Sequence, residues 1–242
     1  NSNACQMYKS LIEGNYIHHT NGNNVQQGDG IEIKEGSYEN TVRDNVIHDT
    51  LYPCIITYGT VGNGGPNIIE RNVMWGCGDH GIQTAANAII RNNIIVGAAS
   101  DGIRNQTHQA ASPHDLVIVH NTIVKSGKAA IRCDSISGSV VIANNALYVQ
   151  NGQALRVSGD LSKLVMAGNV GVGGTQGGVT GYNNNGNLMA DLVAASYSGK
   201  VPNDVFPRAG GALDGAGDTK HVTPDDFNGT LRGGAADVGA YK

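Results

Sequence analysis

Short segments in which apolar and polar residues alternate recur along the chain, and the stretch 28–49 shows one complete repeat. Its first part has two isoleucines that alternate with two charged residues, which is the two-residue period of a half-buried strand. These residues are Ile31, Glu32, Ile33 and Lys34. Gly36 interrupts this strand, and a second apolar segment, from Thr41 to Ile47, precedes the next turn. Two short strands separated by a bend therefore make up most of one repeat.

The same repeat returns down the chain in two series of residues. An Asn followed by two mostly apolar residues occurs about every 26 residues, within the roughly 20–30 residues that compact solenoid repeats span. Its seven occurrences begin at Asn15, Asn45, Asn72, Asn93, Asn121, Asn145 and Asn169. The second series is Ile31, Ile55, Ile82, Ile103, Ile131 and Leu155. Because the two series stay in phase, they predict an all-β solenoid of about seven rungs built from short parallel strands.

The regularity ends before the C-terminus. The segment Gly171–Asn187 is rich in Gly and Asn and loses the apolar alternation, so regular stacking is predicted to stop there. We assign residues 1–178 to the rungs and residues 179–242 to a C-terminal capping segment of the same domain. The best candidate for a short helix is Leu188–Tyr197. The remaining tail is predicted to fold back irregularly over the last rung, because a solenoid must hide its open strand edges.

Composition agrees with one elongated domain. The 242 residues are 40% hydrophobic but only 5% aromatic, and the chain contains 35 Gly, which suits narrow stacked rungs better than a helical bundle. The net charge of −4 argues against a nucleic-acid-binding protein, which would be basic. No run of 18 apolar residues occurs, so no membrane span is predicted. We expect a monomer.

The four cysteines allow a disulfide but do not require one. Cys54 and Cys77 are predicted at nearly equivalent corners of adjacent rungs, where a bridge is possible. The alternative is two small buried thiols, since free Cys is often buried. The chain begins at Asn1 with no signal-like hydrophobic stretch, as expected for a mature or trimmed product that lacks earlier rungs or an N-terminal cap.

With its Asn and Ile ladders, the chain resembles the right-handed parallel β-helix proteins of the pectate-lyase type. The ending is similar to the closing segment of many secreted bacterial β-helix proteins, through residues 214–218, 226–232 and 237–241. The resemblance implies a right-handed coil, secretion or display at the cell surface, and carbohydrate as the partner. It does not define the activity, because this scaffold hosts lyases, glycoside hydrolases, epimerases and adhesins.

Outward-facing residues of the first strand in each rung supply a candidate binding row. Parallel strands lie roughly 4.8 Å apart, so residues in one register form a line along the surface. The register of Glu32 continues as Ile56, Gln83, Arg104, Arg132 and Arg156. Three stacked arginines repel one another unless an anion lies over them, and an acidic, uronate-containing polysaccharide offers carboxylates at a comparable spacing. The alternative is a solvated face whose charges are balanced by acidic neighbours such as Asp134.

Lys34 is the leading catalytic candidate. In lyases of the resembled scaffold, a Lys or Arg removes the C5 proton of the uronate, and the pair Glu32 and Lys34 is similar to residues of such enzymes. We predict Lys34, Tyr58 and Arg104 as the catalytic set, with Tyr58 as an acid or a stacking group. The alternative for Lys34 is a solvated ammonium paired with Glu32 or Glu35.

Acidic residues give a second interpretation. Asp79 and Asp101 are expected on adjacent rungs, within the roughly 5–10 Å that separates the carboxylates of glycoside hydrolases. Asp before Gly is equally ordinary turn chemistry. A Ca²⁺ site is predicted from three clustered carboxylates. Its residues are Asp29, Glu32 and Glu35.

Rings and amides complete the predicted substrate-binding set. His48 shares its register with Trp75 and His18, while His80 lies in the register of Asp29 and Asp101. We assign His48, Trp75 and His80 to sugar binding together with Glu32, Gln83, Arg132 and Arg156; ordinary stacked surface side chains are the alternative. The sequence therefore favours a secreted lyase-like protein that cleaves an acidic polysaccharide by β-elimination. A glycoside hydrolase and a noncatalytic carbohydrate-binding or surface protein are the competing predictions.

Overall fold

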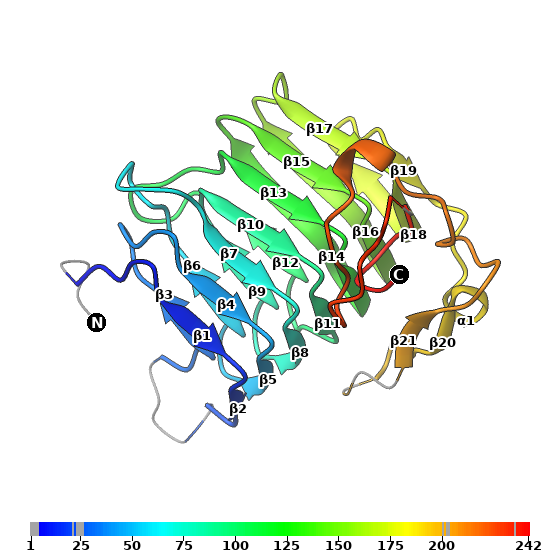
Figure 1. Cartoon of the computed structure of the whole chain (residues 1–242), viewed down its shortest axis with the longest axis horizontal. Coiled ribbons are helices and arrows are strands. Elements are labelled where there is room, and N and C mark those ends of the chain that lie inside the picture. The colour runs from blue at the N-terminus through cyan, green and yellow to red at the C-terminus, as the bar shows by residue number, and fades with distance from the viewer. Residues whose placement is uncertain (1–4, 21, 23–26, 200, 202–203, 235) are drawn as a thin grey trace.

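The protein is a parallel β-solenoid in which successive turns contribute strands to three faces (Figure 1). A computed structural model describes residues 5–20, 22, 27–199, 201, 204–234 and 236–242. Face 1 is a seven-stranded parallel sheet that contains β1 (Leu11–Glu13), β4 (Thr41–Arg43), β7 (Asn67–Glu70), β10 (Ala88–Arg91), β13 (Leu116–Val119), β15 (Val140–Ala143) and β17 (Leu164–Ala167).

Faces 2 and 3 form one continuous sheet because three long strands turn the corner between them. Face 2 contains β2 (Tyr16–His18), β5 (Val46–Thr50), β8 (Val73–Cys77), β11 (Ile94–Val96) and the first parts of β14 (Thr122–Ile136), β16 (Ala146–Gly159) and β18 (Asn169–Gln176). Face 3 contains β3 (Ile31–Ile33), β6 (Ile55–Thr57), β9 (Ile82–Thr84), β12 (Ile103–Asn105) and the second parts of the same long strands. The predicted all-β solenoid is confirmed, with about six complete turns.

Each face contributes one ladder of branched apolar side chains to the interior. On face 3 the paired residues are Ile31, Ile55, Ile82, Ile103, Ile131 and Leu155, which is the register predicted from the sequence. The most exposed of them, Ile31, is only 7% accessible. Each fully buried aliphatic side chain contributes about 1.5–3 kcal/mol relative to an exposed one. The stack of ladders therefore makes one continuous core along the coil axis.

The asparagine series forms a hydrogen-bonded ladder at the corner between faces 1 and 2. In each step the amide Nδ2 of one Asn donates to Oδ1 of the Asn on the next rung, over 2.9–3.0 Å. The same Oδ1 accepts the backbone N–H of the first Asn. The residue before each ladder Asn has a left-handed backbone, which makes the corner sharp. The ladder therefore has a structural role.

The end of the coil differs from the prediction in the length of its helix. The last long strand, β18, pairs with β16 through register shifts and ends at Gln176, and the short β19 (Tyr182–Asn183) pairs with β18. The predicted helix Leu188–Tyr197 is only α1 (Leu188–Asp191), capped by the side chain of Asn187. Extended pairing takes over directly after it, in an antiparallel hairpin of β20 (Leu192–Ala194) and β21 (Asp204–Pro207).

The C-terminal tail lies along the flank of the coil, whereas the sequence suggested a fold-back over the last rung (Figure 1). A second apolar cluster joins outward residues of face 2, such as Val124 and Tyr148, to Leu192, Leu213 and Val238 of the tail. Tyr148 is fully buried, and its hydroxyl donates to Asp191 over 2.7 Å. The tail includes a short 3₁₀ helix, η1 (Thr219–His221). Outward apolar side chains thus explain why the tail follows this face.

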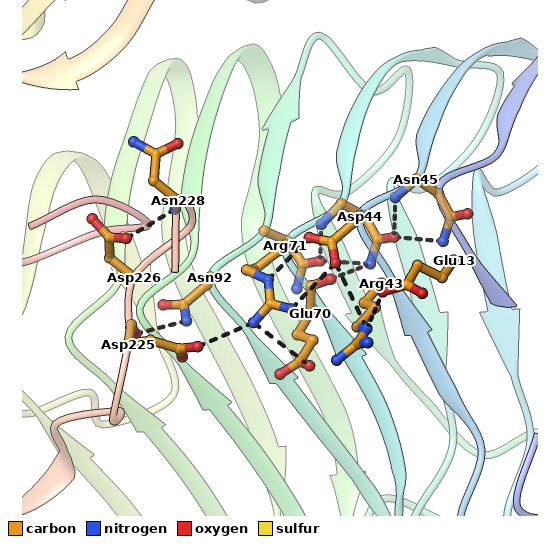
Figure 2. A network of polar contacts seen from close by, with 12 residues as sticks. Glu13, Arg43, Asp44, Asn45, Glu70, Arg71, Asn92, Asp225, Asp226 and Asn228 are labelled. Carbon is orange, nitrogen blue, oxygen red and sulfur yellow. Dashed lines mark hydrogen bonds and ion pairs between the residues drawn. The ribbon is translucent and has the colours of Figure 1, made fainter. Parts of the chain in front are cut away.

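Polar contacts fix the tail to the same corner that the asparagine ladder occupies. Figure 2 shows Arg71 between Asp44 of the previous rung and Asp225 of the tail, with nitrogen–oxygen distances of 2.9 and 3.1 Å. Nδ2 of Asn92 donates to the backbone oxygen of Asp225 over 3.0 Å. The fully buried Arg232 donates to Asn92 Oδ1 and to several backbone carbonyls of the tail. These contacts satisfy a buried cation that would otherwise be costly.

Cys54 and Cys77 form a disulfide between adjacent rungs, with their Cα atoms 5.3 Å apart, so the bridge that the sequence left open is present. Cys5 is a free, exposed thiol and Cys133 a free, buried one. Burial raises the pKa of Cys133 to about 12, which keeps it protonated and unreactive.

With regard to membranes, no helix in the described part of the chain has the length and apolar character that a transmembrane segment needs.

We expect Asn93→Ala to lower the free energy of unfolding by about 2–4 kcal/mol. The amide of Asn93 accepts from Asn72 and donates to Asn121 and to two backbone carbonyls, and its loss leaves several buried groups unpaired. Denaturant unfolding followed by circular dichroism measures the change. The control is Asn228→Ala, which removes an exposed Asn of the tail and is expected to cost less than about 0.5 kcal/mol. Equal stability of the two variants would contradict the ladder's role.

Removal of the disulfide in the double variant Cys54→Ala/Cys77→Ala is expected to cost about 3.5 kcal/mol, from the chain entropy of a loop with a sequence separation of 23. Reductant should destabilise the unaltered protein but leave the double variant unchanged. Cys133→Ala controls for the loss of a buried sulfur and should keep its sensitivity to reductant. If reductant has no effect on the unaltered protein, the bridge does not contribute to stability.

Candidate functional site

The outward side chains of face 3 form the row that the sequence predicts. Strand pairing aligns Glu32, Ile56, Gln83, Arg104, Arg132, Arg156 and finally Gln176. Two positions further along the same rungs are Lys34, Tyr58, Gln106, Asp134 and Ser158. The two rows bring together residues from distant parts of the chain, and they divide into an acidic end near Glu32 and a basic end near Arg132.

At the basic end, three arginines converge on Asp134. Its carboxylate lies 2.8 Å from Nη1 of Arg104, 2.7 Å from Nη2 of Arg132 and 3.9 Å from Nε of Arg156. Burial opposes the charge of Asp134, but the hydrogen bond from Arg132 and the nearby positive charges together lower its pKa. The acidic neighbour considered from the sequence is therefore present. One carboxylate balances only one of three guanidinium groups.

Two of these arginines remain accessible to a ligand. The side chain of Arg104 is only 10% exposed, whereas those of Arg132 and Arg156 are 28% and 36% exposed. Arg104 also lies 3.8 Å from Asp101 and donates to Gln106 over 3.0 Å. Arg104 therefore lies on the inner side of the row, where it contacts Asp101 and Gln106, whereas Arg132 and Arg156 face outward.

Arg132 and Arg156 line a cleft of about 450 Å³ at the corner between faces 2 and 3. The other lining residues are Asp101, Lys128, Ala129, Asn151, Gly152 and Gln153. Lys128 is exposed and has a left-handed backbone, with φ of 63°. Beside the cleft, the buried amine of Lys125 donates to the backbone oxygens of Ser100 and Gly127, and burial lowers the pKa of Lys125 to about 8. The cleft thus combines three cations, one carboxylate and two amides.

At the acidic end, Glu32 holds Lys34 and Tyr58 together. Its carboxylate forms an ion pair with the ammonium of Lys34 and accepts the hydroxyl of Tyr58 over 3.0 Å. Nζ of Lys34 lies 5.2 Å from the centre of the Tyr58 ring. Burial first, and then the bond to Glu32, raise the pKa of Tyr58 above its ordinary value, so the phenol stays protonated. Two of the three predicted catalytic residues therefore meet, while Arg104 lies two strands beyond Tyr58.

His108 joins this group from the loop between β12 and β13. Its ring packs edge-on against Tyr58, with centroids 4.8 Å apart. Burial and the charge of Lys34 lower the pKa of His108, so the imidazole is neutral at pH 7. Its Nδ1 is buried and has no hydrogen-bond partner among the residues that the structure describes. A neutral base, a protonated phenol and an ammonium are thus adjacent.

The three carboxylates predicted as Ca²⁺ ligands all belong to the rung that contains β3. Among the described residues, the group of metal-ligand type whose donor atoms lie within 4.8 Å of one another is His19, His48 and Asp49, which contains none of Asp29, Glu32 and Glu35. Glu32 is instead engaged by Lys34 and Tyr58. Burial, followed by repulsion from Glu32, raises the pKa of Asp29 to about 6. The Ca²⁺ site stays a prediction.

The carboxylates considered for a hydrolase occupy the turn before face 3. Asp101 is buried, and its Oδ1 accepts the backbone N–H of Ala129 over 3.0 Å. The N–H of Asp101 donates to Nδ1 of His80, and burial lowers the pKa of His80 despite the charges of Asp79 and Asp101. These contacts match the turn interpretation of Asp101. Asp79 is more exposed and lies 3.5 Å from Nε2 of His80.

His48 and Trp75 do not belong to this row, because their strands lie on face 2. Their rings stack on each other and not on face 3. The predicted binding residue Gln83 is in the row but is only 6% exposed. The sequence did not point to His108 or Lys128. The long connection between Asn105 and Leu116 was the available signal for a loop that returns over face 3, but its length did not indicate where His108 would lie.

Comparison with known proteins adds the family but no individual relative. No curated protein matches the chain, and no solved structure does. The family model described as "Right handed beta helix region" matches residues 3–147, which is more than half of the chain and includes face 3 as far as Arg132. The chain therefore belongs to the right-handed β-helix family.

Proposed function

We propose that the protein binds an acidic, uronate-containing polysaccharide along face 3 and cleaves it by β-elimination at the Lys34–Tyr58–His108 group. The observation that carries the proposal is the cleft in which Lys128, Arg132 and Arg156 face outward. The chain as a whole has a net charge of −4, so this concentration of positive charge is local. Guanidinium groups bind carboxylates through paired, charge-assisted hydrogen bonds, which makes a polyanion the fitting ligand.

The cleft and the Lys34 group lie on one line that a polymer can follow. Arg132 lies three strands from Tyr58 along face 3, a distance of about 14 Å at roughly 4.8 Å per strand. A chain bound in the cleft by its carboxylates therefore extends over Gln83 toward Tyr58. This geometry favours a polysaccharide over a small acidic metabolite, which would occupy only the cleft.

Elimination requires a base, an acid and a group that neutralises the uronate carboxylate. We assign the base to neutral His108, which takes the proton from C5, and the acid to Tyr58, which protonates the departing O4 as the C4–O4 bond breaks and a C4–C5 double bond forms. Lys34 then neutralises the carboxylate next to C5. The resemblance to lyases favours Lys34 as the base, but the ion pair of Lys34 with Glu32 suits the ammonium role better. Arg104 supports the binding row.

Two other functions remain testable. A glycoside hydrolase would use Asp79 with Asp101, although Asp101 is buried and accepts a backbone N–H. A noncatalytic binding or surface protein would use the cleft alone.

We also propose secretion or display at the cell surface, which the Cys54–Cys77 disulfide supports because such bonds persist in oxidising compartments.

The double variant Arg132→Ala/Arg156→Ala should weaken binding of polygalacturonate, alginate or a glycosaminoglycan by about tenfold or more. Each lost guanidinium removes charge-assisted hydrogen bonds, which are worth about 1.5–3 kcal/mol when desolvated and less where the group is exposed. Affinity electrophoresis or calorimetry at fixed salt measures the effect, with neutral dextran as the ligand control. Arg43→Ala is the matched protein control, because Arg43 is 35% exposed and lies on face 1. Equal loss in both proteins would mean that general charge, not the cleft, determines binding.

Tyr58→Phe and His108→Gln should each lower the elimination rate by about 100-fold or more while polysaccharide binding persists. The unsaturated product is followed by its ultraviolet absorbance. Because the pKa of His108 is lowered below its ordinary value of 6.5, the midpoint of the loss of activity on acidification should lie below pH 6.5, where the imidazole becomes protonated.

The products separate the three functions. Reducing ends without the new absorbance would indicate hydrolysis, and binding without either product would indicate a binding protein. Lys34→Ala tests the neutralising role, because it should reduce elimination even when His108 and Tyr58 are intact. Full elimination activity in Lys34→Ala, or in both Tyr58→Phe and His108→Gln, would refute the assignment of this group.

A further inference from the structure

The outer side of face 2 carries a stack of rings at its N-terminal end. Strand pairing aligns His18, His48 and Trp75 on three successive rungs. The ring centroids of His18 and His48 are 5.1 Å apart and those of His48 and Trp75 are 4.3 Å apart, each pair with an interplanar angle of 7°. His48 is only 7% exposed, so its ring is held between two neighbours.

On the first two of these rungs, the residue after the stacked ring has a side chain that can bind a metal ion. His19 and Asp49 have left-handed backbones, with φ of 54° and 51°, and they occupy equivalent places on adjacent rungs. The equivalent residue on the following rung is Gly76, where a Cβ atom would lie 2.7 Å from Oδ1 of Asp49. The chain therefore has room for the Asp49 side chain beside His48.

We propose that His19, His48 and Asp49 bind a divalent transition-metal ion, with Zn²⁺ as the representative. One donor atom from each of these residues lies within 4.8 Å of the other two. A tetrahedral Zn²⁺ with bonds of about 2.1 Å needs donors about 3.4 Å apart, so modest side-chain rotation completes the site. Two imidazoles with one carboxylate suit zinc-like ions, whereas Ca²⁺ and Mg²⁺ favour sites built from oxygen.

The existing hydrogen bonds supply both an inner and an outer shell. Nδ1 of His48 lies 2.7 Å from Oδ2 of Asp49, and Nε2 lies 2.8 Å from the hydroxyl of Tyr16. A metal ion would replace the proton shared by Nδ1 and Asp49, and the Nε2–H would then donate to Tyr16. Ligating histidines commonly donate their second nitrogen in this way, which fixes the ring and the tautomer.

The site is accessible and has space for a fourth ligand. The Asp49 side chain is 46% exposed, and His19 lies at the surface. Nδ1 of His18 is 2.7 Å from Nδ1 of His19, so a further imidazole is adjacent to the three ligands. A water molecule can complete a tetrahedral shell. The site lies on face 2 and does not depend on the function proposed for face 3.

Trp75 provides a direct test, because it is the only Trp in the chain and stacks on His48. We would strip the 242-residue chain of metal, titrate it with Cu²⁺ while following Trp75 fluorescence, and titrate it with Zn²⁺ in a calorimeter. The expected result is saturable, one-to-one binding with quenching of the fluorescence. His19→Asn and Asp49→Asn should each weaken binding tenfold or more, and Asn tolerates the left-handed backbone at both positions.

His114→Asn is the matched control, because His114 also contacts an adjacent carboxylate, that of Asp115, over 2.9 Å, and is not part of the three-residue group. Its Zn²⁺ affinity should equal that of the unaltered protein. Absence of saturable binding would overturn the proposal. Affinity unchanged in both His19→Asn and Asp49→Asn, or reduced equally in His114→Asn, would also overturn it.

Discussion

In-register stacking of parallel strands is the constraint on which the rest of this structure depends. Each rung satisfies its backbone hydrogen bonds with the rungs above and below, so a residue's place in the repeat determines its neighbours. The ladder asparagines reinforce this register at the sharpest corner, because each Oδ1 accepts both an amide and a backbone N–H from the adjacent rung. A slip by one residue would turn the isoleucines outward and leave the buried amides unpaired.

The same constraint that builds the core also concentrates charge on the surface. Arg104, Arg132 and Arg156 are far apart in sequence, but one register brings them together. Asp134 makes the arrangement tolerable, since it lies close enough to contact two of the guanidinium groups directly. It does not cancel the positive charge, because the remaining cations stay at the surface of the cleft. In a repeat of this kind, one basic residue at the same position of each rung is therefore enough to form a row that can bind a polyanion.

The sequence predicted the positions of residues that the repeat determines, but not the positions of residues in loops outside the repeat. The Ile and Asn ladders, the arginine row and the meeting of Lys34 with Tyr58 all follow from a period and a register. The position of His108 does not, because it depends on how a long loop folds back over face 3. The predicted helix was too long because helical propensity in a short segment yields to the pairing of Leu192 with Pro207.

The tail shows how outward positions could have been interpreted more fully. On face 2 the outward residues of the early rungs include His18, His48 and Trp75, whereas the later rungs present Val124 and Tyr148. Apolar outward side chains on a solenoid need a cover, and the tail supplies one over the later rungs. The arrangement leaves the histidine-rich part of the same face accessible. One face is thus divided between later rungs, where valine and tyrosine are covered by the tail, and early rungs, where imidazoles and a carboxylate lie close together.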